Sequence, residues 1–149
     1  LLLAGNQNHI VNRNRYEGYL KAFRDLNMNV DVNMIFLDMN NKRLIDRAVN
    51  TIMERHIDCI VCSDDLICSR VLAKLDEDNY SIPKDVKVAS FYNNAHLESH
   101  NPPITAMSIN VKELGVTAGR RLIEIISEGY RIPKSWVNYE IVLKKSTSN

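Results

Sequence analysis

The chain has 149 residues, 45% of them hydrophobic and 25% charged, which is typical of one globular domain with a sizeable core. Nineteen basic and 18 acidic residues leave a net charge of +1, so the composition gives no electrostatic footprint for nucleic acid. The sequence has no apolar run long enough to predict a membrane-spanning helix. The apolar start at residues 1–5 is too short for a signal-peptide core and predicts a buried strand instead.

The first half of the chain alternates short apolar segments with helical periodicity. Residues 34–38 and 58–62 predict two further strands after the first. Two amphipathic helices are predicted between the three strands, from apolar residues spaced three and four apart. Their apolar residues are Tyr16, Tyr19, Leu20, Phe23 and Leu26 in the first helix, and Leu44, Ile45, Ala48, Val49, Ile52 and Met53 in the second.

The second half continues the alternation. Ser63 is a predicted helix N-cap, and a strand follows at 86–91, a loop at 92–101 and a short strand at 104–108. A last helix begins at Asn110 and ends at Gly129, before a strand at 139–143 and a polar tail at 144–149. The predicted buried residues of the helix after Ser63 are Leu66, Ile67, Val71, Leu72 and Leu75, and the apolar residues that complete the last helix are Val111, Leu114, Ala118, Leu122, Ile125 and Ile126.

Strands that alternate with helices of this length predict an α/β fold with a doubly wound, mostly parallel sheet. In such sheets ligands bind beyond the carboxyl ends of the strands. The candidate positions are therefore residues 6–15, Asp38, residues 63–65 and residues 92–94.

Four of these residues, Arg13, Arg15, Asp64 and Asn93, combine guanidinium donors with carboxylate and amide acceptors. Such a mixture suits a hydroxyl-rich ligand, whose OH groups both donate and accept hydrogen bonds. The alternative is a structural ion pair between Arg15 and Asp64 on a solvated surface, and the residues alone leave both interpretations open.

Metal and cofactor chemistry is not expected. Asp64 and Asp65 could form part of a magnesium site, but capping of a helix N-terminus explains them better. His96 and His100 lie in a predicted loop with no third ligand at a suitable spacing. Cys59 and Cys62 have C-x-x-C spacing inside a predicted strand, where they point to opposite faces, so with Cys68 they are predicted to be reduced packing residues.

Four motifs resemble the lactose/galactose repressor family in order and approximate spacing. The motifs are Arg15-Tyr16-Glu17-Gly18-Tyr19, Ser63-Asp64-Asp65-Leu66, Ile82-Pro83 through Val88-Ala89-Ser90-Phe91, and Pro102-Pro103-Ile104-Thr105 with Leu114-Gly115 beyond. The Ser-Phe form of the third motif is most similar to the maltose-type branch. The resemblance implies a periplasmic-binding-protein-like (type I) fold of two subdomains, with a sugar or another small effector between them.

The resemblance also implies a domain organisation. Residues 1–101 would be part of the C-terminal effector-binding subdomain, residues 102–130 would cross to the N-terminal subdomain, and residues 131–149 would return. The DNA-binding helix-turn-helix would be absent from this chain. The implied function is effector binding and dimerisation in a cytoplasmic transcriptional repressor.

Site residues follow from matching positions in the family. Arg15 matches an effector-binding arginine, Ser63 stands where an asparagine is usual, Asp64 follows it, and Tyr92 with Asn93 replaces an acid or amide. Departures at Ser63 and Tyr92 imply altered hydroxyl recognition or stacking on a sugar ring. The matching homodimer-interface positions are Cys68, Ser69, Arg70, His96, Leu97 and His100.

Two other classes of protein are consistent with the same fold. A periplasmic sugar-binding protein of a transport system would share the cleft but would be secreted and monomeric. An α/β phosphotransferase would use Asp64 and Asp65 with magnesium, and no further acid cluster supports it.

Overall fold

The computed structural model describes residues 1–129 and 135–148, apart from the side chains of residues 52 and 53. Its centre is a six-stranded sheet with the order β2-β1-β3-β4-β5-β6. Neighbouring strands run parallel from β2 to β5, and β6 is antiparallel to β5. The strands are β1 (Leu2–Leu3), β2 (Ile35–Phe36), β3 (Cys59–Cys62), β4 (Lys87–Ser90), β5 (Thr105–Ile109) and β6 (Tyr139–Val142). The α/β, mostly parallel architecture predicted from the sequence is thus confirmed.

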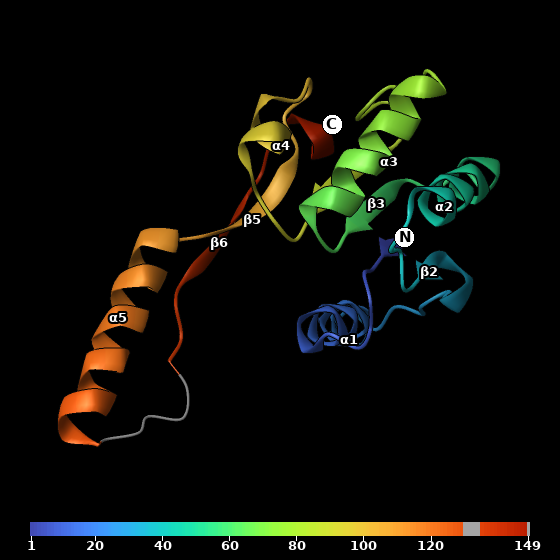
Figure 1. Cartoon of the computed structure of the whole chain (residues 1–149). Coiled ribbons are helices and arrows are strands. Elements are labelled where there is room, and N and C mark those ends of the chain that lie inside the picture. Colours follow the sequence, from blue (N-terminus) through green and yellow to red (C-terminus); the bar gives the residue numbers. More distant parts are fainter. Residues whose placement is uncertain (130–134, 149) are drawn as a thin grey trace.

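The helices cover the sheet unequally (Figure 1). The connection from β1 to β2 runs in one direction along the sheet, and those from β2 to β3 and from β3 to β4 run in the other. Because such crossovers are right-handed, α1 lies on one face of the sheet, and α2 and α3 lie together on the other. The helices are α1 (Ile10–Asp25), α2 (Lys42–Glu54), α3 (Asp65–Glu77), α4 (Ala95–Ser99) and α5 (Val111–Glu128), with short 3-10 turns η1 (Val32–Met34) and η2 (Lys145–Thr147).

The core lies between the sheet and the α2–α3 layer. Apolar residues of α3 recur every three or four positions, so that one side of the helix is fully buried against β3 and β4. Cys62 and Cys68 belong to this core as free thiols. The hydrogen bond to Cys68 and burial both raise the pKa of Cys62, so it packs as a neutral residue. The fully buried core side chains include Leu3, Val49, Ile60, Val71, Leu72, Leu75, Val88, Leu97 and Ile104.

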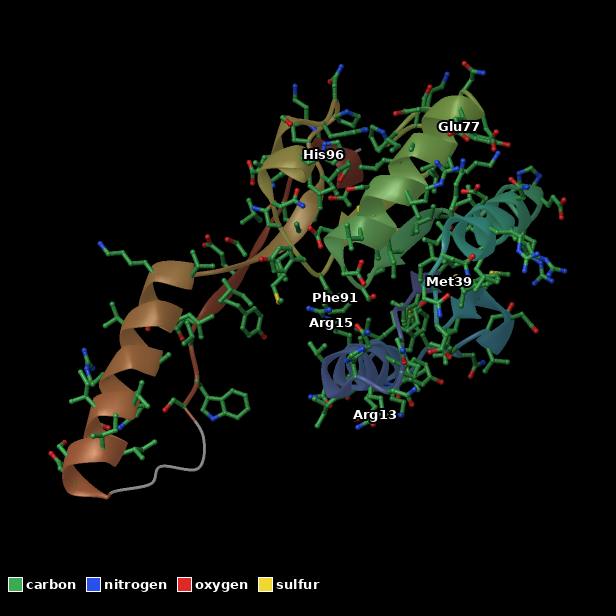
Figure 2. The ribbon with its side chains drawn as sticks, in the orientation of Figure 1. Arg13, Arg15, Met39, Glu77, Phe91 and His96 are labelled. Carbon is green, nitrogen blue, oxygen red and sulfur yellow. The ribbon has the colours of Figure 1, made fainter. Side chains whose placement is uncertain are left out.

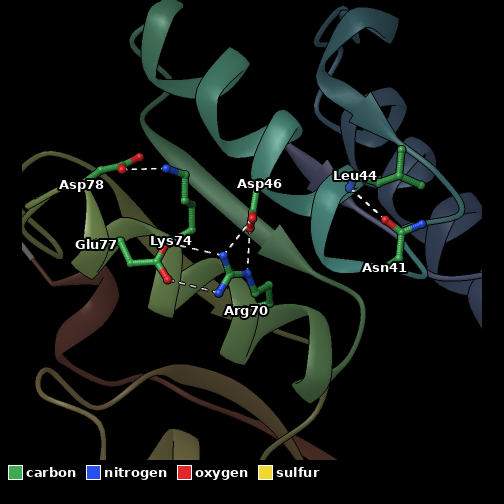
Figure 3. Close-up of polar contacts among 7 residues, drawn as sticks. All are labelled: Asn41, Leu44, Asp46, Arg70, Lys74, Glu77 and Asp78. Carbon is green, nitrogen blue, oxygen red and sulfur yellow. Dashed lines mark hydrogen bonds and ion pairs between the residues drawn. The ribbon is translucent and has the colours of Figure 1, made fainter.

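Ion pairs lie along the outer side of the contact between α2 and α3 (Figure 3). The Arg70 guanidinium donates to both carboxylate oxygens of Asp46 at 2.7 and 2.8 Å, and it also reaches Glu77. Lys74 pairs with Asp78 one turn further along α3. The bidentate contact to Asp46 fixes the relative position of the two helices.

This contact predicts a pH dependence. The hydrogen bond from Arg70 holds the pKa of the Asp46 carboxyl below its ordinary value. The pair therefore stabilises the fold above the unfolded-state pKa of Asp46, and this contribution is lost as the pH falls through the lower folded-state value. We expect Arg70→Met to return the Asp46 pKa towards its ordinary range, measured by NMR titration of the side-chain carbonyl. Arg43→Met, at an exposed position of α2, is the control and should leave the Asp46 pKa lowered.

The helix α5 and the strand β6 form an arm that extends away from the body (Figure 1). No residue of α5 is buried, and Leu122 and Ile126 are 59% and 76% exposed. The apolar side of this helix is therefore exposed along most of its length, while Val111 and Leu114 near its start line a hollow together with Tyr92 and Asn93. Apolar residues on β6 and before it, including Trp136, Tyr139 and Ile141, are exposed as well. Contiguous apolar surface of this kind is rarely exposed to water on a monomeric protein.

The C-terminal segment is built into the sheet, although the sequence predicts a polar tail. Ser146, in η2, is fully buried. Its hydroxyl donates to the Val88 carbonyl at 2.6 Å and accepts the Thr105 amide at 2.8 Å. Thr105 in turn accepts the Lys144 amide through its own hydroxyl at 2.8 Å. A polar segment can thus replace a strand at the start of β4 and β5, because its hydroxyls satisfy the backbone groups there.

Two smaller differences concern loops. The predicted loop 92–101 contains α4, which begins after Asn94, whose side chain accepts the Leu97 amide at 2.9 Å. The predicted strand 34–38 shortens to β2, because η1 occupies the preceding residues. Both depend on local side-chain caps that periodicity does not detect.

One part of the sheet surface remains open. An apolar groove of about 360 Å³ runs over β3, β4 and β5, and it is lined by Val61, Ala89, Phe91, Met107 and Ile141, among others. The groove and the arm therefore both expose contiguous apolar surface of the kind that proteins bury against another surface.

Candidate functional site

The loops that follow β1, β2 and β3 converge at one edge of the sheet, as a doubly wound fold requires. Between them lies a pocket of about 460 Å³. Amide side chains dominate its rim, with Met39, Ile45 and Leu66 supplying apolar surface. The polar lining includes Asn6, His9, Asn12, Asn40, Asn41, Lys42, Asp64 and Asp65. Of the five predicted ligand residues, Asp64 alone lines this pocket.

The Asp64 carboxylate is held in place by two hydrogen bonds. One carboxylate oxygen caps α3 by accepting the Ile67 amide at 2.9 Å, and the other accepts the Ser63 hydroxyl at 3.2 Å. The Ser63 hydroxyl also accepts the Gly5 amide at 2.9 Å. Ser63 is fully buried, so its hydroxyl positions Asp64 and does not face the pocket as predicted for a ligand contact.

The close approach of Gly5 to this network predicts a mutational effect. A Cβ atom at Gly5 would lie 2.8 Å from the Asn12 amide nitrogen and 3.2 Å from an Asp64 oxygen. We expect Gly5→Ala to lower the free energy of unfolding by about 1 kcal/mol, since both side chains must shift. Gly18→Ala, in α1 with nothing within 4 Å of its added methyl group, should instead stabilise by about 0.5 kcal/mol. Urea unfolding of the two variants checks the sign of each effect.

Arg15 lies beside this pocket rather than in it. Its guanidinium stacks over the Phe91 ring, 5.9 Å from the ring centroid (Figure 2). Burial lowers the pKa of Arg15, and the nearby Asp64 carboxylate opposes this change, so the side chain stays charged. The contact with Phe91 leaves the edge of the guanidinium, where its donors lie, free to meet a ligand. Sequence reasoning did not identify Phe91 as the residue that positions Arg15.

The loop at Met39 and the two following asparagines was also missed. Asp38 has a positive φ of 56° and accepts the Gln7 amide at 2.8 Å. This left-handed turn directs Met39, Asn40 and Asn41 into the pocket. The one available signal was their position directly after a predicted strand.

Tyr92 and Asn93 line a separate hollow of about 130 Å³, together with Met107, Ile109, Val111 and Leu114. The side-chain amide of Asn93 is already occupied, since it donates to Glu98 at 2.7 Å and accepts from Lys144 at 3.0 Å. The structure therefore does not bring Tyr92 and Asn93 into the pocket that Asp64 lines.

The predicted interface residues differ in accessibility. Cys68 and Leu97 are fully buried within the chain and cannot present their side chains to a partner. His96 is exposed, whereas Ser69, Arg70 and His100 are partly exposed. The ring of His100 is hydrogen-bonded to the Pro102 carbonyl at 2.9 Å.

The described part of the chain shows neither a metal-binding cluster nor a membrane-spanning helix. Over 1–129 and 135–148, no three His, Cys, Asp or Glu side chains are arranged to hold a metal ion. Within the same ranges, no helix has the length and hydrophobicity needed to cross a bilayer.

Comparison with known proteins identifies the family. Residues 1–147 match the family described as the periplasmic binding protein-like domain. The HTH-type transcriptional repressor PurR of Actinobacillus pleuropneumoniae is 27% identical over 99% of this chain and 46% of its own length. The regulator RegA of Clostridium saccharobutylicum is 26% identical over 89% of this chain and 41% of its length. The chain thus spans about half the length of the curated relatives it matches.

Solved structures agree in fold. The transcription regulator CcpA of Lactococcus lactis superposes with a TM-score of 0.86 at 22% identity, over 99% of this chain and 55% of that one. The probable maltose operon repressor MalR of Staphylococcus aureus gives 0.86 at 25% identity, over 98% and 52%. The regulator CelR in complex with cellobiose gives 0.83 at 20% identity, over 97% and 45%.

The chain therefore belongs to the family of periplasmic binding protein-like domains, and it corresponds to about half of the effector-binding domain found in LacI-family transcriptional regulators. The relatives found are regulators rather than enzymes. Their similarity supports the lactose/galactose repressor family, without distinguishing a maltose-type branch.

Proposed function

We propose that the chain is the effector-binding and dimerisation region of a cytoplasmic DNA-binding repressor, and that its effector is a sugar. The observation that carries this proposal is the pocket at the strand ends, where Asp64 faces several asparagine side chains. Amides and one carboxylate both donate to and accept from hydroxyl groups, and Met39 with Leu66 offers apolar surface to a sugar ring. The cellobiose complex of CelR is consistent with such a ligand.

In this proposal a second subdomain would form the other half of the cleft. Residues 1–101 would belong to one subdomain, residues 102–130 would start in its sheet with β5 and cross to the other, and residues 131–149 would return. The exposed apolar residues of α5 favour this division, because a second subdomain would bury them. Arg15, Asp64 and Tyr92 would then contact an effector held between the subdomains, with Ser63 and Asn93 acting through their neighbours.

The proposed mechanism is closure of the two subdomains around the effector, which changes how a dimer presents its DNA-binding heads. The proposed dimer surface includes Ser69, Arg70, His96 and His100, which are accessible on the α3–α4 side. Cys68 and Leu97 would support it from the core. The proposed DNA contact lies in a helix-turn-helix outside this chain.

A thermal-shift screen of the complete polypeptide tests the proposal. The probes are maltose, cellobiose and glucose, with glucose 6-phosphate as an anionic comparison. A rise in melting temperature that saturates with a neutral sugar supports a sugar effector. A rise with glucose 6-phosphate alone would indicate that the effector is an anionic ligand and not a neutral sugar.

The alternative is a periplasmic sugar-binding protein of a transport system, which shares the fold and the cleft. The regulator names of the relatives favour the repressor. Intact mass and N-terminal peptide sequencing from cells separate the two. A helix-turn-helix upstream of this chain supports the repressor, whereas a cleaved secretory signal would overturn it.

A further inference from the structure

A cluster of polar side chains joins the loop after β4 to the end of β6. The Lys144 side chain is only 10% exposed, and its ammonium group donates to the Glu98 carboxylate at 2.5 Å and to the Asn93 side-chain oxygen at 3.0 Å. The Asn93 amide nitrogen donates to the same Glu98 oxygen at 2.7 Å. Each of the three side chains thus contacts the other two. Lys144 joins segments that are distant in sequence, since 51 residues separate it from Asn93 and 46 from Glu98.

Both ends of this cluster are anchored. On one side, Lys144 directly precedes η2, whose Ser146 is buried between β4 and β5. On the other side, the next residue in the loop, Asn94, donates to the Asp65 carboxylate at 2.7 Å while capping α4. Asp65 lines the pocket at the strand ends. Two sets of hydrogen bonds, linked through the backbone between Asn93 and Asn94, therefore connect the pocket through the loop to the strand that returns from the arm.

We propose that Lys144 is a positioning residue which clamps the loop carrying Tyr92 and Asn93 to the end of β6. Asn93 transmits this connection and is not itself a ligand contact, because both ends of its side-chain amide are already bonded. Movement of β6 would then displace the loop, and displacement of the loop would loosen the C-terminal segment. That such movement accompanies ligand binding rests on the proposed function, whereas the clamp itself does not.

Hydrogen exchange of the complete polypeptide, followed by mass spectrometry without ligand, tests the clamp. We expect Lys144→Met to speed amide exchange about tenfold both in residues 91–94 and in residues 143–148, since charge-assisted hydrogen bonds are lost. Lys145→Met is the matched control at the neighbouring exposed position and should change neither segment. Lys144→Arg should restore slow exchange, because its guanidinium can reach the same acceptors.

Reciprocity distinguishes a clamp from a local surface pair. Asn93→Ala should speed exchange in residues 143–148, although it leaves the pair of Lys144 and Glu98 intact. The proposal is overturned if Lys144→Met and Lys145→Met behave alike, if exchange rises near residue 144 alone, or if it rises equally throughout the core. Because no ligand is added, these outcomes do not depend on the effector screen, and a failed screen leaves the clamp standing.

Discussion

Ser146→Ala is expected to lower the free energy of unfolding by about 3 kcal/mol, because it leaves two buried backbone groups without a partner. The Ser146 hydroxyl accepts the Thr105 amide and donates to the Val88 carbonyl, and the residue is fully buried. Alanine fills nearly the same space but can make neither bond. Water cannot replace the hydroxyl without opening the seam between η2 and the sheet.

Equilibrium unfolding in urea, monitored by circular dichroism, measures this loss. Ser148→Ala is the control two residues further on, where the hydroxyl is exposed and makes one long bond to the Lys144 carbonyl at 3.3 Å. Its effect should stay within about 0.5 kcal/mol. Similar midpoints for the two variants would show that the C-terminal segment contributes little to the stability of the sheet.

The second large effect concerns ligand binding. Arg15→Ala in the complete polypeptide is expected to weaken binding of the effector identified by the screen by about 100-fold. A loss of this size is typical when a charged hydrogen-bond donor is removed from a desolvated site. The stacking of Arg15 over Phe91 and the proximity of Asp64 hold the guanidinium at the edge of the cleft before any ligand arrives. A preorganised donor of this kind contributes more than a mobile one.

Isothermal titration calorimetry measures the change in affinity, and Arg24→Ala provides the control. Arg24 lies in the last turn of the same helix at an exposed position, so its loss removes an equal charge without touching the cleft. Unchanged affinity in Arg15→Ala would remove this residue from the proposed site. Reduced affinity in both variants would instead indicate a long-range effect of charge.

The sequence by itself determined the architecture. Apolar strand segments alternate with helices whose apolar residues recur every 3.6 residues, and this was sufficient to predict an α/β fold with a parallel sheet. The recurrence shows which side of each helix faces a core. It also located the edge of the sheet where the pocket lies, because parallel strands bring their carboxyl ends together. Asp64 was correctly placed there, but the prediction that Ser63 caps α3 is wrong, because the cap is the Asp64 carboxylate, which accepts the Ile67 amide.

Only the tertiary structure decided how the polar residues are used. Ser63 is adjacent to Asp64 in sequence, yet the approach of Gly5 from β1 buries its hydroxyl. Asn93 is engaged by Lys144 from a segment 51 residues away. The sequence predicts Ser146 to be part of a polar tail, yet it is buried where the starts of β4 and β5 leave backbone groups to be paired. Hydrogen-bond partners distant in sequence decide all three cases, and periodicity carries no information about them. The apolar side of α5 shows the same division, since the pattern identifies a surface that must be covered but not the segment that covers it.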